Sequence, residues 1–265
     1  MLNGTRSDLN DWKRQVLGRL RPYLDRREFL QAAAVGSAAL AGAAFRPGRA
    51  VAGAKAVKAV KTGTFSFPRL LFHVKDETKD IWNAYPIADV ILRRRLEQLT
   101  NINVNQNPVV VQLADLEKLC RYPFVFATSE GYFDLPKNEE ANLREFLMRG
   151  GFVHADDCVL GHTGDRFFRD YVKMVKRLFP DHEMERVPDD HEIYHCYFDL
   201  PKGSPFLQGK DHGGWGLFEK GTGRIMTFVT PGDLHCGWTF QFFTPAKNEA
   251  AVKMGVNIII YYLTH

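Results

Sequence analysis

Short apolar runs alternate with amphipathic segments through most of the chain. The apolar runs have the length and the β-branched or aromatic content of buried strands, and they cover residues 69–74, 108–111, 123–128 and 152–155. The segments between them place apolar residues at helical spacing, over residues 87–96, 113–119, 136–147 and 164–179. This alternation predicts an α/β fold with a mostly parallel sheet flanked by helices.

The pattern changes in the C-terminal part of the chain. Residues 184–200 and 215–230 are rich in aromatic and β-branched residues, and Gly221-Thr222-Gly223 interrupts the second run. Such a glycine-rich break predicts a β-hairpin turn, so we expect an added β-hairpin in the C-terminal half. Residues 248–263 then predict a closing apolar helix.

The positive charge of the chain is concentrated at its start. Residues 1–54 hold 9 of the 35 Lys and Arg residues but only 4 of the 31 Asp and Glu residues. The rest of the chain is close to neutral, which argues against a basic surface for nucleic acid.

Residues 1–54 are typical of an export signal. Arg26-Arg27 is followed by an Ala-rich apolar run over residues 29–45, which resembles a twin-arginine signal peptide. We expect cleavage after Ala54, with Ala43 as the alternative. A buried helix is the competing interpretation. The prediction places the protein in the periplasm or outside the cell, and in the membrane only if the leader is retained as an anchor.

The predicted domain boundaries follow from this leader. Residues 55–64 form a Lys/Ala/Gly linker without apolar periodicity, and residues 65–265 form a single α/β domain. Proteins exported by the twin-arginine route fold before they cross the membrane, and many of them acquire a cofactor first. For this chain we nevertheless predict no cofactor.

Polar side chains follow several predicted strands. Because the carboxyl ends of parallel strands meet at one edge of a sheet, we expect a ligand-binding crevice there. The predicted ligand-binding residues are Asp156, Asp157, Asp233, His235, Glu130 and Trp238. In the alternative interpretation, the Asp156-Asp157 pair caps backbone N–H groups of the following loop.

A divalent metal is a further use for these carboxylates. The candidate ligands are Asp156, Asp157, His162, Asp233 and His235, and a metal-dependent hydrolase that uses Asp156 and Asp157 is the function that they would support. Trp82, Trp215 and Trp238 adjoin loops, where an indole can stack on a sugar, although packing in the core or at its rim is the favoured interpretation.

The segment His191-Glu192-Ile193-Tyr194-His195 matches the zinc-protease pattern His-Glu-x-x-His. That pattern binds zinc only on a helix. The aromatic and β-branched residues that follow favour an extended chain, in which the two histidines would stand about 13 Å apart, too far for one metal. We therefore expect no zinc-protease site.

Scattered motifs resemble a known bacterial family. They are Arg69-Leu70, Trp82-Asn83, Pro86, Ala88-Asp89, Tyr122-Pro123-Phe124, Leu143-Arg144, Gly150-Gly151-Phe152, Asp156-Asp157, Phe179-Pro180, His191 and Gly223-Arg224. They resemble the exported family DUF4159, a domain of unknown function whose activity is not established. That family is similar in fold to the class I glutamine amidotransferase-like superfamily, which implies a flavodoxin-like sheet flanked by helices.

The same superfamily places a nucleophilic cysteine after a strand, near the position of Cys158. Here the preceding carboxylates of Asp156 and Asp157 would raise the pKa of the thiol, and neither Asp157 nor Val159 supplies the glycine of a strained turn. No His-x-Glu pair occurs near the C-terminus. We therefore predict a domain without glutaminase activity and assign no catalytic residue.

The four cysteines show no Cys-x-x-Cys spacing, so they predict neither a disulfide framework nor a thiolate zinc site. Taken together, the sequence predicts an exported cell-envelope protein that binds a small polar ligand, an envelope glycan or an envelope protein. Whether it is an enzyme stays open, and a metal-dependent hydrolase using Asp156 and Asp157 is the alternative.

Overall fold

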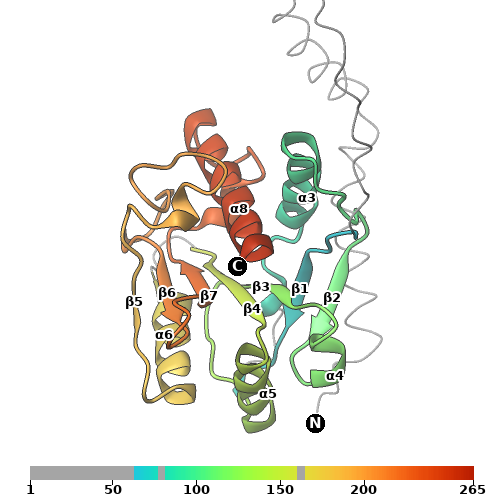
Figure 1. Cartoon of the computed structure of the whole chain (residues 1–265), viewed down its shortest axis with the longest axis vertical. Coiled ribbons are helices and arrows are strands. Elements are labelled where there is room, and N and C mark those ends of the chain that lie inside the picture. Colours follow the sequence, from blue (N-terminus) through green and yellow to red (C-terminus); the bar gives the residue numbers. More distant parts are fainter. Residues whose placement is uncertain (1–62, 77–80, 160–164) are drawn as a thin grey trace, which may run out of the picture. The chain divides into compact units, whose positions relative to one another are not determined.

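A seven-stranded β-sheet, in the order β2-β1-β3-β4-β7-β6-β5, organises the domain (Figure 1). The computed structural model describes residues 63–76, 81–159 and 165–265, and within these the neighbouring strands β2, β1, β3, β4 and β7 run parallel. Strand β6 then pairs antiparallel with β7, and β5 pairs antiparallel with β6. The strands are β1 (Pro68–Leu71), β2 (Val109–Gln112), β3 (Phe124–Ser129), β4 (Phe152–Asp157), β5 (Met184–Arg186), β6 (Trp215–Phe218) and β7 (Ile225–Thr230).

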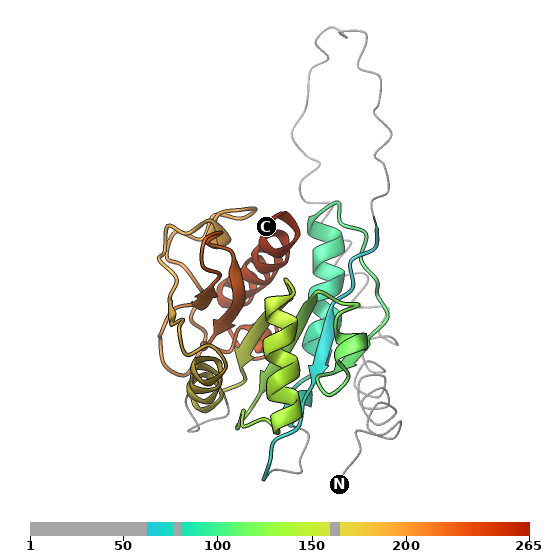
Figure 2. The ribbon, with the colours of Figure 1, turned by 60° about the horizontal axis from the view of Figure 1, so that its bottom comes forward.

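Helices cover both faces of this sheet (Figure 1). Helices α3, α7 and α8 lie on one face, and α4, α5 and α6 lie on the other. Figure 2 views the same layers with α5 in front of the strands. The helical elements are η1 (Ile81–Asn83), α3 (Ile87–Leu99), α4 (Leu116–Leu119), α5 (Lys137–Met148), α6 (Arg166–Leu178), η2 (Glu192–Tyr194), α7 (Leu234–Gly237) and α8 (Pro245–Thr264).

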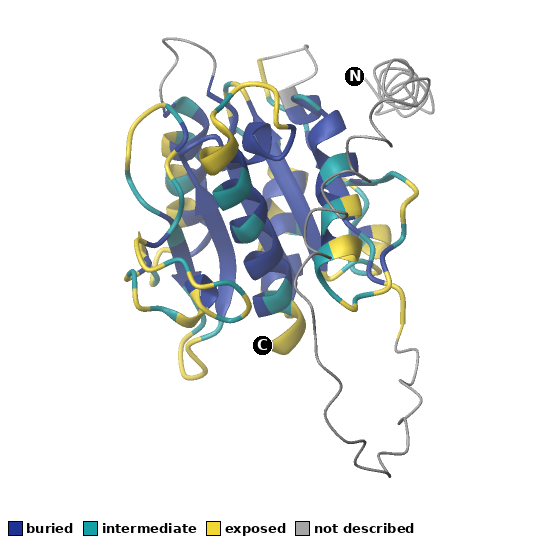
Figure 3. Ribbon diagram, turned by 90° about the horizontal axis from the view of Figure 1, so that it is seen from above, coloured by how far each residue is buried: buried dark blue, intermediate teal, exposed yellow. Residues whose placement is uncertain are grey.

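Strands β3, β4 and β7 are buried along their whole length (Figure 3). Their near-continuous apolar sequences suit strands that are covered on both faces. Phe124 and Phe152 face each other in the β3–β4 register, and their rings stack with centroids 5.7 Å apart. The register also sets Asp156 at the end of β4 opposite Thr230 at the end of β7, which brings the two carboxyl ends level.

A buried ion pair connects helix α3 to the sheet. Arg69 on β1 donates from Nε and Nη2 to both oxygens of Asp89 on α3, at 2.7 and 2.5 Å. Its Nη1 donates to the backbone oxygen of Ala84 at 2.7 Å, and its guanidinium lies 5.2 Å from the centre of the Phe126 ring. Arg69 is 0% exposed and Asp89 1% exposed, so neither charge has water as an alternative partner.

The observed architecture confirms the predicted α/β class, with a mostly parallel, flavodoxin-like sheet. The predicted hairpin is also confirmed, because the turn at Gly221–Gly223 joins antiparallel β6 and β7. Strand β4 extends two residues further than predicted and includes both carboxylates, Asp156 and Asp157. The predicted leader, most of the linker and His162 lie outside the described residues.

The prediction of an extended chain around residues 190–198 is wrong. After the short strand β5, residues Glu192–Tyr194 form a single turn of 3-10 helix. His191 begins this turn, and its imidazole accepts a hydrogen bond from the backbone N–H of Ile193. A local side-chain cap of this kind outweighs the strand propensity of the aromatic residues.

We expect the substitution Arg69→Ala to lower the free energy of unfolding by about 3–5 kcal/mol, because it leaves the buried Asp89 carboxylate without its partner. Arg95→Ala is the matched control: Arg95 pairs with Glu249 at 3.1 Å, but both side chains are about one-third exposed, so the loss should be at most about 1 kcal/mol. Urea denaturation of the two variants measures the difference, and equal losses would contradict the role given to Arg69.

Candidate functional site

The carboxylate of Asp156 is the centre of a polar cluster at the carboxyl edge of the sheet. Its Oδ1 accepts hydrogen bonds from the Thr230 hydroxyl and, at 3.0 Å, from the backbone N–H of Leu234. Its Oδ2 accepts from the backbone N–H of His235 at 3.1 Å and lies 3.1 Å from Nδ1 of the same residue. Asp156 is 0% exposed, so protein donors alone satisfy this carboxylate.

Asp157 points to the other face of the sheet and has a different partner. Its Oδ2 accepts from the backbone N–H of Phe168 at 2.9 Å, in the first turn of α6. Burial, with a smaller contribution from the nearby carboxylates of Asp156 and Asp233, raises the pKa of Asp157 to about 8, and the Phe168 hydrogen bond opposes this rise. Both aspartates therefore accept backbone N–H groups, but Asp156 accepts those of α7 and not those of the following loop, which the capping alternative named.

A strained turn follows β7. Asp233 has φ 60° and ψ 46°, in the left-handed region that Asp adopts more readily than most side chains, and it begins the short helix α7. Its Oδ2 accepts from Nε2 of Gln208, whereas its Oδ1 has no hydrogen-bond partner among the described residues. Burial raises the pKa of Asp233 to about 6, with Asp156 adding to the rise and His235 opposing it.

Two thiols meet beside this turn. Cys158 follows β4 and Cys236 lies on α7, and their sulfur atoms are 3.7 Å apart. Burial and the carboxylates around it raise the pKa of the Cys158 thiol, although the hydrogen bond with Cys236 lowers it. The pKa of Cys236 is raised by its hydrogen bond with Cys158 and by burial. Neither thiol is in a setting that stabilises a free thiolate.

Ligand-type atoms of four side chains gather here within 4.8 Å of one another, and the side chains are Cys158, Asp233, His235 and Cys236. Each of the four is buried. Behind them, His154 on β4 lies 3.1 Å from the Thr230 hydroxyl through Nε2, and burial lowers its pKa to about 4. The cluster therefore has a neutral imidazole on its inner side.

Only some of the predicted ligand-binding residues lie together in the structure. The structure brings Asp156, Asp233 and His235 together as expected, but in a closed interior and not in an open crevice. Glu130 is exposed in the bend after β3. Trp238 is 0% exposed and donates from Nε1 to the Ala251 oxygen at 3.1 Å, so its indole is part of the core.

The other two candidate tryptophans, Trp82 and Trp215, are also packed against the rest of the domain. Trp82 is 8% exposed, and Trp215 is half-buried and donates from Nε1 to the His212 oxygen at 3.0 Å. Their packing fits the structural interpretation given for these indoles.

The His191–His195 pair does not form a metal site. The His191 imidazole accepts from the Ile193 N–H, whereas His195 contacts Asp199 through Nδ1 at 2.6 Å and the Asp189 oxygen through Nε2 at 2.9 Å. Both ring nitrogens of His195 are thus occupied by a carboxylate and a carbonyl. The segment forms a 3-10 turn, so the extended chain on which the expectation rested is not the reason; the partners of His195 are.

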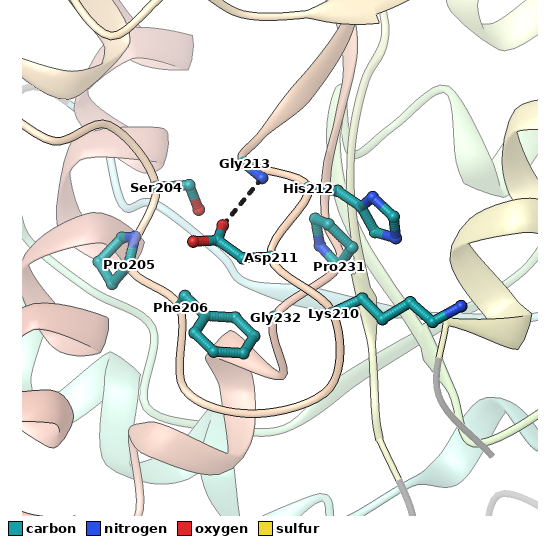
Figure 4. Close-up of a pocket in the computed structure, with 9 residues that line it drawn as sticks. All are labelled: Ser204, Pro205, Phe206, Lys210, Asp211, His212, Gly213, Pro231 and Gly232. Atoms are coloured by element: carbon teal, nitrogen blue, oxygen red, sulfur yellow. Dashed lines mark hydrogen bonds between the residues drawn. The ribbon is translucent and has the colours of Figure 1, made fainter. Parts of the chain in front are cut away.

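A surface depression adjoins the turn that follows β7 (Figure 4). Pro231 and Gly232, which precede Asp233, line it together with the loop that leads to β6. Within that loop, the Asp211 carboxylate accepts from the Gly213 N–H at 3.3 Å. The lining residues are Ser204, Pro205, Phe206, Lys210, Asp211, His212, Gly213, Pro231 and Gly232.

The fold and this edge cluster define a flavodoxin-like α/β domain with a buried polar site at the carboxyl ends of β4 and β7. The family model of a domain of unknown function, DUF4159, matches residues 70–263. The chain belongs to that family. A comparison with curated proteins finds no match.

The structure adds residues that the sequence patterns missed. Cys236 contacts Cys158, although the spacing of the four cysteines predicts no such pair. Gln208, which donates to Asp233, lies on a loop with no apolar periodicity. A signal for Cys236 does exist in the chain: the segment Asp233-Leu234-His235-Cys236 places three metal-ligand types within four residues after a strand.

We expect Asp156→Asn to lower the free energy of unfolding by about 3 kcal/mol. The amide N–H₂ of Asn would replace a carboxylate oxygen that now accepts hydrogen bonds, so one donor group would face another. Asp181→Asn, at an exposed turn, is the control and should change stability by no more than about 0.5 kcal/mol. Chemical denaturation followed by tryptophan fluorescence gives both values. A loss at Asp156 no larger than that of the control would remove it from the centre of the cluster.

Proposed function

We propose that this protein is an exported cell-envelope domain that binds a glycan in the surface depression of Figure 4 and has no glutaminase activity. The observation that carries this proposal is the position of the depression. It adjoins the carboxyl end of β7, the edge where open α/β sheets bind their ligands. The twin-arginine pattern in residues 1–54 supports an envelope location.

The lining of the depression combines an aromatic ring with polar side chains. Phe206 is 37% exposed and offers an aromatic face, on which the apolar face of a sugar packs. Ser204 and Asp211 also line the depression (Figure 4), and a hydroxyl and a carboxylate are groups that bond sugar hydroxyls. A flat apolar face beside polar acceptors matches a glycan better than a purely ionic ligand.

The absence of glutaminase activity is supported by the surroundings of Cys158. Its side chain is 3% exposed and its sulfur contacts a second thiol, so a substrate carbonyl has no direct approach. The raised pKa keeps the thiol protonated, which suppresses nucleophilic attack. His235, the nearby imidazole, is engaged by Asp156.

The alternative of a hydrolase that uses Asp156 and Asp157 has less support. Both oxygens of Asp156 already accept from protein donors, and Asp157 accepts from Phe168. Catalytic metal sites need carboxylate oxygens that are free to bind the ion and a position open to water. Neither aspartate is more than 2% exposed.

The glycan proposal is tested by co-sedimentation of the mature protein with isolated peptidoglycan sacculi. We expect Phe206→Ala and Asp211→Asn each to weaken retention by about tenfold, from the loss of one stacking contact or one charged acceptor. Phe242→Ala, which removes another exposed phenylalanine outside the depression, should leave retention unchanged.

Failure of the wild-type protein to sediment with sacculi, or equal retention of all variants, would overturn glycan binding. Release of ammonia from glutamine by the reduced protein would overturn the second part of the proposal, and Cys158→Ser would then identify the thiol responsible.

Export is tested separately with the full chain. In the described residues no helix is long and apolar enough to cross a membrane. We expect the double substitution Arg26→Lys and Arg27→Lys to move most of the protein from the periplasmic to the cytoplasmic fraction of a bacterium with a twin-arginine pathway. Arg46→Lys is the control, and an unchanged distribution in the double variant would exclude twin-arginine export.

A further inference from the structure

The group formed by Cys158, Asp233, His235 and Cys236 has a composition that hydrogen bonding alone does not explain. Two thiols, a carboxylate and an imidazole place ligand-type atoms within 4.8 Å of one another. Asp233 and His235 are 0% exposed, Cys158 is 3% exposed and Cys236 is 7% exposed. Soft sulfur ligands and an imidazole at this separation are the donors that zinc prefers in proteins.

Two buried polar atoms of this group lack a partner. Asp233 Oδ1 accepts no hydrogen bond from the described residues and lies 3.7 Å from His235 Nδ1. A carboxylate can only accept hydrogen bonds, so the contact with Asp156 assigns the ring proton of His235 to Nδ1. This leaves a lone pair on Nε2 of His235, which also has no partner in the described part of the chain. Buried polar groups without partners are rare, and a ligand is one explanation for them.

The distance between the thiols distinguishes a metal site from a disulfide. In a tetrahedral zinc site, bonds of about 2.3 Å place two thiolate sulfurs about 3.8 Å apart. The sulfur atoms of Cys158 and Cys236 are 3.7 Å apart, whereas a disulfide bond would hold them at about 2.05 Å. The side chains thus already have the spacing of a thiolate pair on zinc.

We propose that Cys158, Asp233, His235 and Cys236 bind one zinc ion in a closed tetrahedral site. Four protein ligands leave no position for water or substrate, so the ion is structural. On binding, the two thiols each release a proton and form zinc–sulfur bonds, and the Asp233 carboxylate and a ring nitrogen of His235 complete the coordination. The zinc ion reduces three buried negative charges to one.

Backbone geometry supports this assignment. Asp233 is held in a left-handed conformation directly after Gly232, and Gln208 fixes one of its oxygens while the other stays free. Strain at a non-glycine residue is typical of a functional site. Asp156 accepts from the ring of His235, and a carboxylate behind a metal-bound histidine orients the imidazole in many zinc sites, so Asp156 is a positioning residue here.

The site is independent of the proposed glycan binding. Pro231 and Gly232 line the depression of Figure 4, whereas none of the four proposed ligands lines it and all four are buried. Zinc content and sacculus binding are separate measurements, so either proposal can fail alone.

The test measures metal in the full chain, produced in zinc-supplemented medium and purified without chelators. We expect about one zinc ion per chain by elemental analysis. Exchange with cobalt should give the intense visible d–d and thiolate charge-transfer bands of tetrahedral, sulfur-ligated Co²⁺. These spectra of the wild-type protein decide the proposal even where a variant fails to fold.

Variants then assign the ligands. Cys158→Ser and Cys236→Ser should each lose the zinc ion and the cobalt–thiolate band. Asp233→Asn, which keeps a side chain tolerant of the left-handed backbone, should weaken zinc binding by at least about tenfold. Cys120→Ser is the matched control, since Cys120 is a free thiol outside the cluster, and it should keep full zinc content.

Three results would overturn the zinc site. The first is a folded, reduced wild-type protein that binds neither zinc nor cobalt when they are added. The second is a purified protein whose intact mass shows the loss of two hydrogens, with peptide mapping that joins Cys158 to Cys236. Full zinc content in both Cys→Ser variants would equally exclude these ligands.

Discussion

The buried carboxylate of Asp156 is the interaction on which the edge of this domain depends. A carboxylate without water is tolerated only where protein donors surround it. Here the donors come from the end of β7, at Thr230, and from the first residues of α7, at Leu234 and His235. One side chain therefore joins two neighbouring strands to the helix that closes over them, and it sets the orientation of His235.

Much of this arrangement could be predicted from the sequence, because it depends on topology. The apolar runs identify parallel strands, and parallel strands bring their carboxyl ends to one edge, which is why Asp156, Asp233 and His235 were expected to meet. Their burial could not be predicted in the same way. It results from α7, a helix of four residues that is too short to produce a periodic pattern, and from the loop that carries Gln208.

The contact between Cys158 and Cys236 could not be predicted from the sequence either. Cys158 and Cys236 are separated by 78 positions, and their meeting depends on the register between β4 and β7 and on the turn at Asp233. No spacing rule for short motifs covers that distance. The prediction of an extended chain at His191 was wrong for the opposite reason. The side chain of His191 caps the N–H of Ile193, and this local contact outweighs an average propensity that favours strand.

The order of the strands also constrains when the domain can form. In the sheet, β4 lies between β3 and β7, yet β7 is made only after α6, β5 and β6 have been synthesised. The donors of Asp156 at Leu234 and His235 are 78 and 79 residues further along the chain. During translation, β4 therefore leaves the ribosome with one edge unpaired and its carboxylate still hydrated. Such distant pairing makes closure of the sheet slow and late, so for most of its synthesis the chain has a core without a completed edge.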